Sequence, residues 1–220
     1  MKSIPVIVIT IISLLLFLPE ISAQEKKKKN LLKELFGVSI RETSDKFEGT
    51  TTYRMDGNKV FSKLSGSNAL GNLLFGNDDP TFTTFLNLEK HILKDGNFEL
   101  SILFKVNAQN EQFAKVMEGN SLLFLLDDGR LELSTKGSFN SDFDIDMSGV
   151  SSETNARYPI SVNELERINK SNEVEFRIIL DSYKSGAAED RDKSEQYLDG
   201  KFTKRNKKVW IEFYEDYLTE

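Results

Sequence analysis

Apolar and polar residues alternate along several short stretches of the chain, which is the pattern of β-strands that bury one face. In residues 47–55 the apolar face carries Phe47, Tyr53 and Met55. Residues 59–64 are expected to return beside this strand after an Asp-Gly-Asn turn. These residues predict a first β-hairpin.

Two further hairpins are predicted from apolar stretches joined by short turns that contain glycine. Residues 82–93 and 98–106 flank Lys-Asp-Gly-Asn, and residues 121–126 and 130–134 flank Asp-Asp-Gly. Residues 122–126 are apolar at every position, so this strand is expected to be covered on both faces.

Two helices are expected among the strands. A capping box, Ser161-Val-Asn-Glu164, predicts the start of a short helix that ends near Asn169, and residues 173–180 then read as a strand. Residues 204–218 predict an amphipathic helix, because at 100° per residue one face collects its apolar residues. These are Val209, Trp210, Phe213, Tyr214 and Tyr217.

The predicted fold class is therefore α+β and β-rich. Antiparallel hairpins are expected to form a curved sheet or an open sandwich, with the short capped helix and the C-terminal amphipathic helix packed against it. We expect one β-rich domain over residues 45–220, with long loops at residues 65–80 and 181–196. Residues 24–44 are expected to be an N-terminal segment with a short helix around Leu35.

Residues 1–23 are predicted to be a signal peptide. Lys2 precedes an apolar run over residues 4–18, and Ala23 offers a small residue for cleavage. The run has about 15 residues, fewer than the roughly 20 that cross a bilayer. The chain is thus expected to be exported to the periplasm, the outer membrane or the cell surface, with no transmembrane segment after signal removal. An uncleaved anchor, favoured by the lysines at 26–29, is the alternative.

Composition narrows the chemistry. The 220 residues include no cysteine and one histidine, which excludes disulfides, thiolate nucleophiles and metal sites built on several imidazoles. A net charge of -6 argues against general binding to nucleic acid, which needs a basic surface. His91 falls on the same strand face as polar residues, which predicts a surface position. No serine lies in a complete G-x-S-x-G motif, which argues against a Ser–His–Asp triad that uses His91.

One acidic pattern matches a calcium-binding loop in part. Asp142, Asp144, Asp146 and Glu153 occupy positions 1, 3, 5 and 12 of that loop, but Met147 replaces the glycine of position 6. Asp142, Asp144 and Asp146 alternate with apolar residues, which is the pattern of a β-strand, so a solvated acidic strand is the alternative. Calcium is the one cofactor that the sequence leaves open.

A basic run at the start of the C-terminal helix is the second candidate site. Lys204, Arg205, Lys207 and Lys208 would suit an acidic partner or anionic lipid, although a solvated helix start is the alternative. These charges run against the helix macrodipole, which favours acids at the N-terminal end and bases at the C-terminal end.

Three blocks of sequence together resemble a known group of proteins. They are D-x-F-x-G-x-T-x-Y at residues 45–53, a strand–turn–strand at residues 123–133, and a Tyr-Pro-Ile-Ser helix block from Tyr158 followed by Phe-Arg-Ile from Phe176. In these blocks the chain is similar to small exported bacterial proteins of unknown function, mostly from Gram-negative species. The resemblance implies an exported β-rich domain and brings no catalytic residue with it.

The sequence predicts an exported, non-enzymatic binding or structural module of the cell envelope. Its expected partner is an unknown envelope protein or glycan, reached through loops or an exposed sheet edge. Two alternatives stay open at this point. One is a hydrolase that acts through carboxylates alone, and the other is a carrier whose phenylalanine-rich strands enclose an apolar ligand.

Overall fold

A computed structural model describes residues 37–66, 82–109, 112–137, 142–146, 149–184 and 196–219. The strands in these residues are β1 (Ser39–Asp45), β2 (Thr50–Asp56), β3 (Lys59–Gly66), β4 (Phe82–Ile92), β5 (Phe98–Gln109), β6 (Gln112–Lys115), β7 (Ser121–Leu126), β8 (Gly129–Ser134), β9 (Asp142–Asp146), β10 (Gly149–Pro159), β11 (Glu175–Lys184) and β12 (Gln196–Lys201). The helices are α3 (Val162–Lys170) and α4 (Lys204–Tyr217). The predicted signal peptide, the short helix around Leu35 and most of the two long loops lie outside the described residues.

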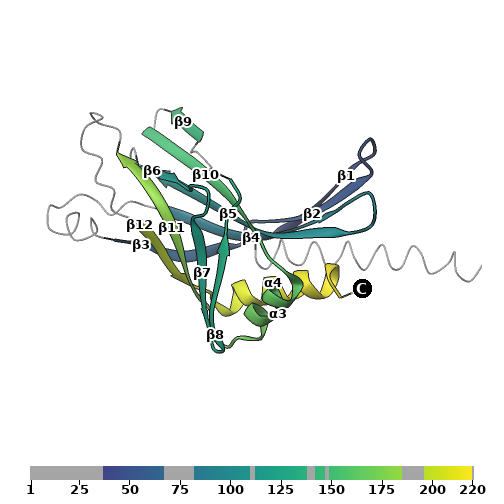
Figure 1. Cartoon of the computed structure of the whole chain (residues 1–220). Coiled ribbons are helices and arrows are strands. Elements are labelled where there is room, and N and C mark those ends of the chain that lie inside the picture. Colours follow the sequence, from purple (N-terminus) through teal and green to yellow (C-terminus); the bar gives the residue numbers. More distant parts are fainter. Residues whose placement is uncertain are drawn as a thin grey trace, which may run out of the picture.

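All of these strands belong to one open, antiparallel sheet. Its main order is β8-β7-β11-β12-β3-β4-β5-β10-β9, with β2 beside β4, β1 beside β2, and β6 beside β11. The sheet is strongly curved, and α3 and α4 lie next to each other beneath it (Figure 1). The predicted β-rich α+β fold with a curved antiparallel sheet, a short capped helix and a C-terminal helix is therefore confirmed. In the part of the chain that the structure describes, neither helix is long and apolar enough to cross a membrane.

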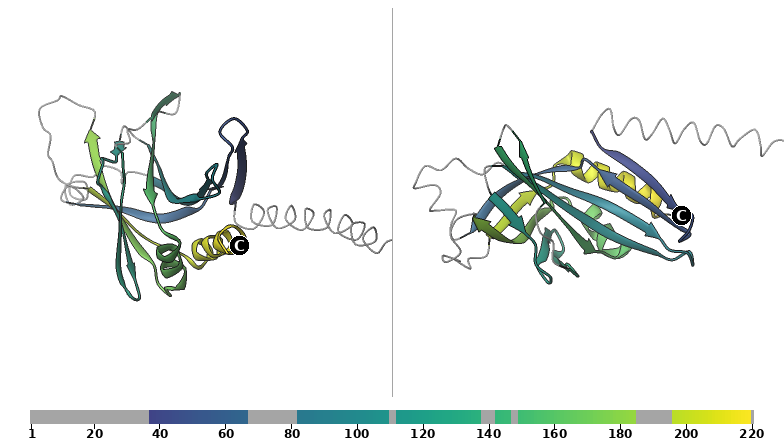
Figure 2. Two further views of the ribbon diagram at one scale, coloured as in Figure 1. Left: turned by 45° about the vertical axis from the view of Figure 1, so that its right-hand side comes forward. Right: turned by 90° about the horizontal axis from the view of Figure 1, so that it is seen from above.

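One face of the sheet, the inner face, carries the core. Side chains at alternate positions of neighbouring strands are buried there, because the register places them in rows across the sheet. Leu86, Phe104 and Ala156 form one such row, and Leu88, Ile102 and Tyr158 form the next. The helices cover part of this face, and two further views in Figure 2 show the sheet curling above them.

The first predicted hairpin was wrong. Residues 59–66 form β3, which pairs with β4 and β12 instead of β2, and the hairpin partner of β2 is β1. Phe47 does not belong to a buried strand face but lies fully exposed in the turn between β1 and β2. The Asp45 carboxylate accepts hydrogen bonds from the Phe47 and Glu48 N–H groups, and Gly49 has a φ of 69° that suits glycine. The sheet consequently starts at Ser39, six residues before the predicted domain boundary.

The strand at residues 122–126 also differs from the prediction. Its inner-face residues Leu122, Phe124 and Leu126 are buried, but Leu125 on the other face is 58% exposed. Leu125 pairs with Glu175 on β11 and Arg130 on β8, so it lies in a row of charged residues on the outer face of the sheet. Nothing among the described residues covers that face there, and the expectation of burial on both faces was wrong.

Candidate binding surface

Helix α4 begins with a second capping box, between Thr203 and Asn206. The Asn206 N–H donates to the Thr203 hydroxyl at 3.2 Å, and the Thr203 N–H donates back to the Asn206 side-chain oxygen at 3.0 Å. This pairing satisfies backbone donors that the first turn of a helix otherwise leaves without partners. The sequence interpretation missed it, because the residue three positions after the cap is Asn instead of Glu or Gln.

The same asparagine attaches α4 to the sheet. The Asn206 amide donates to the Asn58 side-chain oxygen and to the Lys59 carbonyl, both at 2.8 Å. Asn58 in turn donates to the Leu86 carbonyl on β4 at 2.7 Å. Asn58 and Asn206 are each only 1% exposed, so this chain of hydrogen bonds is buried. It fixes where α4 starts relative to β3 and β4.

Aromatic packing then fixes the rotation of the helix. Val209, Trp210 and Phe213 are fully buried, and the Trp210 indole donates to the Leu86 carbonyl at 3.2 Å. The Trp210 ring lies edge-on to Phe202, with ring centroids 4.9 Å apart. The predicted apolar face of this helix is therefore confirmed at its centre, and the opposite side of the helix has to point away from the sheet.

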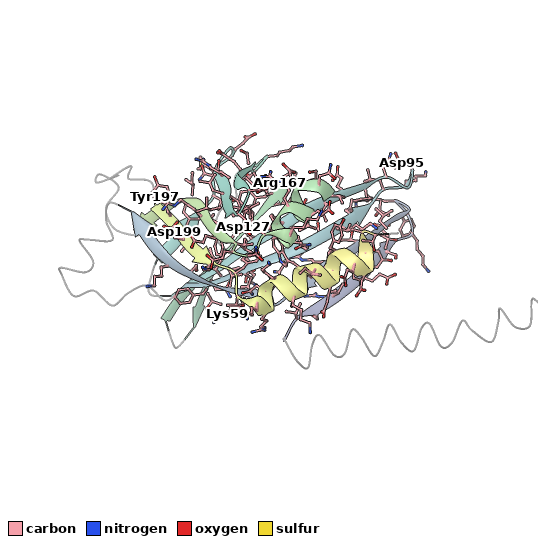
Figure 3. All side chains as sticks on the ribbon, turned by 90° about the horizontal axis from the view of Figure 1, so that it is seen from below. Lys59, Asp95, Asp127, Arg167, Tyr197 and Asp199 are labelled. Atoms are coloured by element: carbon pink, nitrogen blue, oxygen red, sulfur yellow. The ribbon has the colours of Figure 1, made fainter. Side chains whose placement is uncertain are left out.

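That opposite side carries a narrow stripe of Lys204, Lys208, Ile211 and Glu215. At 100° per residue these four positions fall within about 60° of one another, on the side away from Trp210. Lys204, Lys208 and Glu215 are exposed, and Ile211 is half-buried. We call these four residues the α4 stripe. Viewed from below, α4 lies across the sheet on the outside of the molecule (Figure 3).

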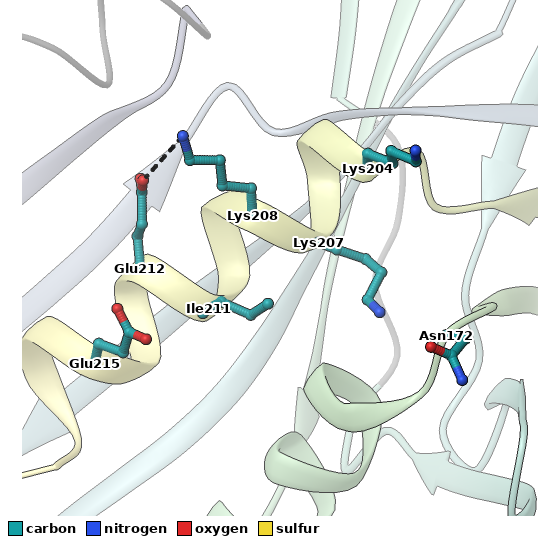
Figure 4. A pocket seen from close by; sticks show the side chains of 7 residues that line it. All are labelled: Asn172, Lys204, Lys207, Lys208, Ile211, Glu212 and Glu215. Atoms are coloured by element: carbon teal, nitrogen blue, oxygen red, sulfur yellow. Dashed lines mark ion pairs between the residues drawn. The ribbon is translucent and has the colours of Figure 1, made fainter.

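An open groove of about 450 Å³ runs along the stripe. Its lining adds Asn172, Lys207 and Glu212 to the four stripe residues. In Figure 4 the Lys207 side chain points toward α3, where its ammonium donates to the Ser171 carbonyl oxygen, while Lys208 and Glu212 point to the other side and approach to 3.9 Å. The groove thus has a basic end near Lys204 and an acidic end near Glu215.

The four predicted basic residues do not all line the groove, and their role as a partner surface stays a prediction. Lys204, Lys207 and Lys208 line the groove, but Lys207 is held by its hydrogen bond to α3. Arg205 lies on another side of the helix, near Gly37 at the start of the described chain. The sequence interpretation missed the acidic half of the surface, although the charge order along the helix contained that signal.

The predicted calcium-loop residues lie on a β-hairpin. Asp142, Asp144 and Asp146 belong to β9, and Glu153 on β10 pairs with Asp142. A strand rises about 3.3 Å per residue, so the backbone of β9 spreads these positions over about 13 Å. The Glu153 carboxylate forms an ion pair with Lys105 and accepts a hydrogen bond from Asn155 at 3.0 Å. Residues 142–146 therefore form a β-strand, as the alternative interpretation expects for an acidic strand. Calcium binding stays a prediction.

His91 is half-buried on the outer face of β4. Its Nδ1 lies 2.8 Å from the Thr52 hydroxyl on the neighbouring β2. The same face holds Glu89, whose side chain is 6% exposed and pairs with Arg157 at 2.6 Å. These contacts tie neighbouring strands together.

The turn between β7 and β8 holds the end of α3 in place. The Asp127 carboxylate accepts hydrogen bonds from the N–H groups of Asn172 and Glu173, which lowers the pKa of Asp127 from 3.8 to about 2. Asp128 binds Arg167 of α3 through two hydrogen bonds, at 2.8 and 3.1 Å. The sequence indicates only that Asp127 and Asp128 are turn residues. The structure shows that they also position the segment that borders the groove.

In comparisons with protein-family models, with curated proteins and with solved structures, the chain has no match. The resemblance to small exported bacterial proteins stays a prediction.

Proposed function

We propose that the protein is an exported, non-enzymatic binding module of the cell envelope that contacts its partner through the outward side of α4. The observation that carries this proposal is the α4 stripe itself. It presents exposed charges of both signs around one half-buried isoleucine, on a helix that buried contacts hold in a fixed orientation.

The attachment of the helix favours a binding role. A surface whose backbone is already fixed loses less conformational entropy when a partner binds. Asn206 and Trp210 anchor α4 on its inner side, so the stripe on the outer side is presented by a rigid element. The groove lining contains three lysines and two glutamates, which suits a charged protein partner better than the apolar ligand of a carrier.

Cross-linking in cells tests the surface. A photoreactive amino acid at Ile211 should give adducts with an envelope component, whereas the same residue at the exposed Lys63 on β3 should give none. Trp210 fluorescence would verify that both variants fold. Adducts from Lys63 and none from Ile211 would overturn the proposed surface, and protease or glycosidase treatment of an adduct would tell a protein partner from a glycan.

The proposal of export has its own test. The mature protein should begin at Gln24 or Glu25 and fractionate with the envelope, because the predicted signal peptide ends at Ala23. Mass spectrometry of the N-terminus measures this directly. An intact Met1 in a cytoplasmic fraction would contradict export while leaving the binding surface to be judged by cross-linking.

A further inference from the structure

The spacing of the α4 stripe is that of a helix–helix contact. Lys204, Lys208, Ile211 and Glu215 are separated by four, three and four residues. This is the spacing of positions d and a in a heptad, but only Ile211 is apolar where a coiled coil carries apolar residues throughout, so the contact has to rely on charge pairing. In an antiparallel pair each d position faces an a position of the other helix, so residue 204 would face residue 215, and residue 208 would face residue 211.

The charges on the stripe fit that arrangement. The first turn of α4 contains no acidic residue and its last turn no basic residue, which is the unfavourable order for the dipole of the helix itself. An antiparallel helix with the same charge order reverses this relation, because each basic end then meets an acidic end. The order disfavours an isolated α4 and favours two that lie side by side in opposite directions.

We propose that the partner on the α4 stripe is a second copy of this chain, bound through an antiparallel pair of α4 helices. This inference rests on the proposed function, since it names the partner of the same surface. Lys204 would face the partner's Glu215 at both ends of the seam, and Lys208 would cover the partner's Ile211 with its aliphatic stem. A two-fold axis between the helices makes each contact occur twice.

The size of this contact sets the affinity that we expect. Helix α4 has 14 residues and is about 21 Å long, so one of its faces buries much less than the roughly 800 Å² per partner of a standard interface. The dimer should therefore be weak and should depend on salt, because exposed ion pairs are screened at high ionic strength. Raising sodium chloride from about 0.05 M to about 1 M, where the Debye length is only about 3 Å, should weaken dimerisation at least tenfold.

Charge reversal tests the register. Sedimentation equilibrium of the mature chain should show a monomer–dimer equilibrium, and Lys204→Glu or Glu215→Lys alone should weaken it at least tenfold. The double variant Lys204→Glu/Glu215→Lys should dimerise again, as should a mixture of the two single variants, because both restore opposite charges across the seam. Lys46→Glu, an exposed position in the turn between β1 and β2, is the matched control and should change nothing.

Cysteine cross-linking tests the direction. The chain has no cysteine, so a single introduced thiol has no other partner within the protein. After oxidation a mixture of Lys204→Cys and Glu215→Cys chains should form a disulfide-linked heterodimer, because a disulfide requires Cα atoms about 4.4–6.8 Å apart. Lys204→Cys alone should not cross-link.

The outcomes separate this inference from the proposed function. A chain that stays monomeric at millimolar concentration and low salt overturns self-association. If Ile211 still cross-links to a different envelope component in cells, the binding surface stands and only the identity of its partner changes. Efficient cross-linking of Lys204→Cys to itself would indicate parallel helices and would also overturn the antiparallel pair.

Discussion

Replacing Asn206 by alanine should destabilise the fold by about 3 kcal/mol. The asparagine side chain makes four hydrogen bonds: it donates to the Asn58 oxygen and to the Lys59 carbonyl, and it accepts from the Thr203 N–H and hydroxyl. Alanine leaves the two acceptors of the sheet without donors in a buried position, and each such loss costs about 1–3 kcal/mol. A typical domain has only about 5–15 kcal/mol of stability, so the effect is large.

Urea denaturation measures this loss directly. Trp210 is the only tryptophan of the chain and is fully buried on the same helix, so its fluorescence reports the detachment of α4 as well as global unfolding. The urea concentration at the midpoint of unfolding should fall, while the slope of the unfolding free energy against urea should change little. This combination indicates a change of stability rather than of the unfolded state. Asn155→Ala is the control, because that side chain is exposed and, among the described residues, is seen to bond to Glu153, so its loss should cost less than about 0.5 kcal/mol.

A third variant separates hydrogen bonding from side-chain size. Asn206→Asp keeps the shape of the side chain but turns a double donor into an acceptor that faces the Asn58 oxygen and the Lys59 carbonyl. It should be less stable than Asn206→Ala at neutral pH, because it also buries a charge. The reasoning fails if Asn206→Ala costs under about 1 kcal/mol, or if Asn206→Asp is as stable as the wild type.

Three further predictions concern other parts of the fold. The pKa of Asp127 is lowered to about 2, so its contribution to stability is complete above the unfolded value near 3.8 and is lost as the pH falls toward 2; the melting temperature should drop less steeply over this window in Asp127→Asn. Gly200→Ala should cost at least about 2 kcal/mol in urea denaturation, because a Cβ there would overlap the Phe176 ring and the Phe61 carbonyl. Phe47→Ser should leave the melting temperature unchanged, because Phe47 is fully exposed.

The central hairpin could be predicted from sequence because large apolar residues recur at alternate positions of its strands. Residues 82–92 and 98–109 alternate along β4 and β5, and the inner-face positions Leu86, Leu88 and Ile102 are fully buried. The capping box at Ser161 was equally readable, since both of its hydrogen bonds are local. Local hydrogen bonds and the alternation of large apolar residues are what a single sequence shows most directly.

Strands β10 and β12 could not be predicted in the same way. The inner face of β10 carries Thr154 and Ala156, which are buried although neither is a large apolar residue. In β12 the inner position opposite Phe176 is Gly200, where the neighbouring ring leaves no room for a side chain. Alternation in the sequence reveals a strand only if its buried residues are large and apolar. At these positions the buried residues are small, because larger side chains on the neighbouring strands occupy the space.

The candidate surface follows from helical periodicity applied to both sides of α4. The sequence interpretation used the period of 3.6 to place Trp210 and Phe213 inward but considered the lysines only as a run along the chain. Once the packing of Trp210 and Phe213 fixes the rotation of the helix, the same period places Lys204 and Glu215 on one outward line. Because the inward and outward residues lie on opposite sides of α4, stability and association should be separable: substitutions at Asn206 should change unfolding, and charge reversal on the stripe should change dimerisation.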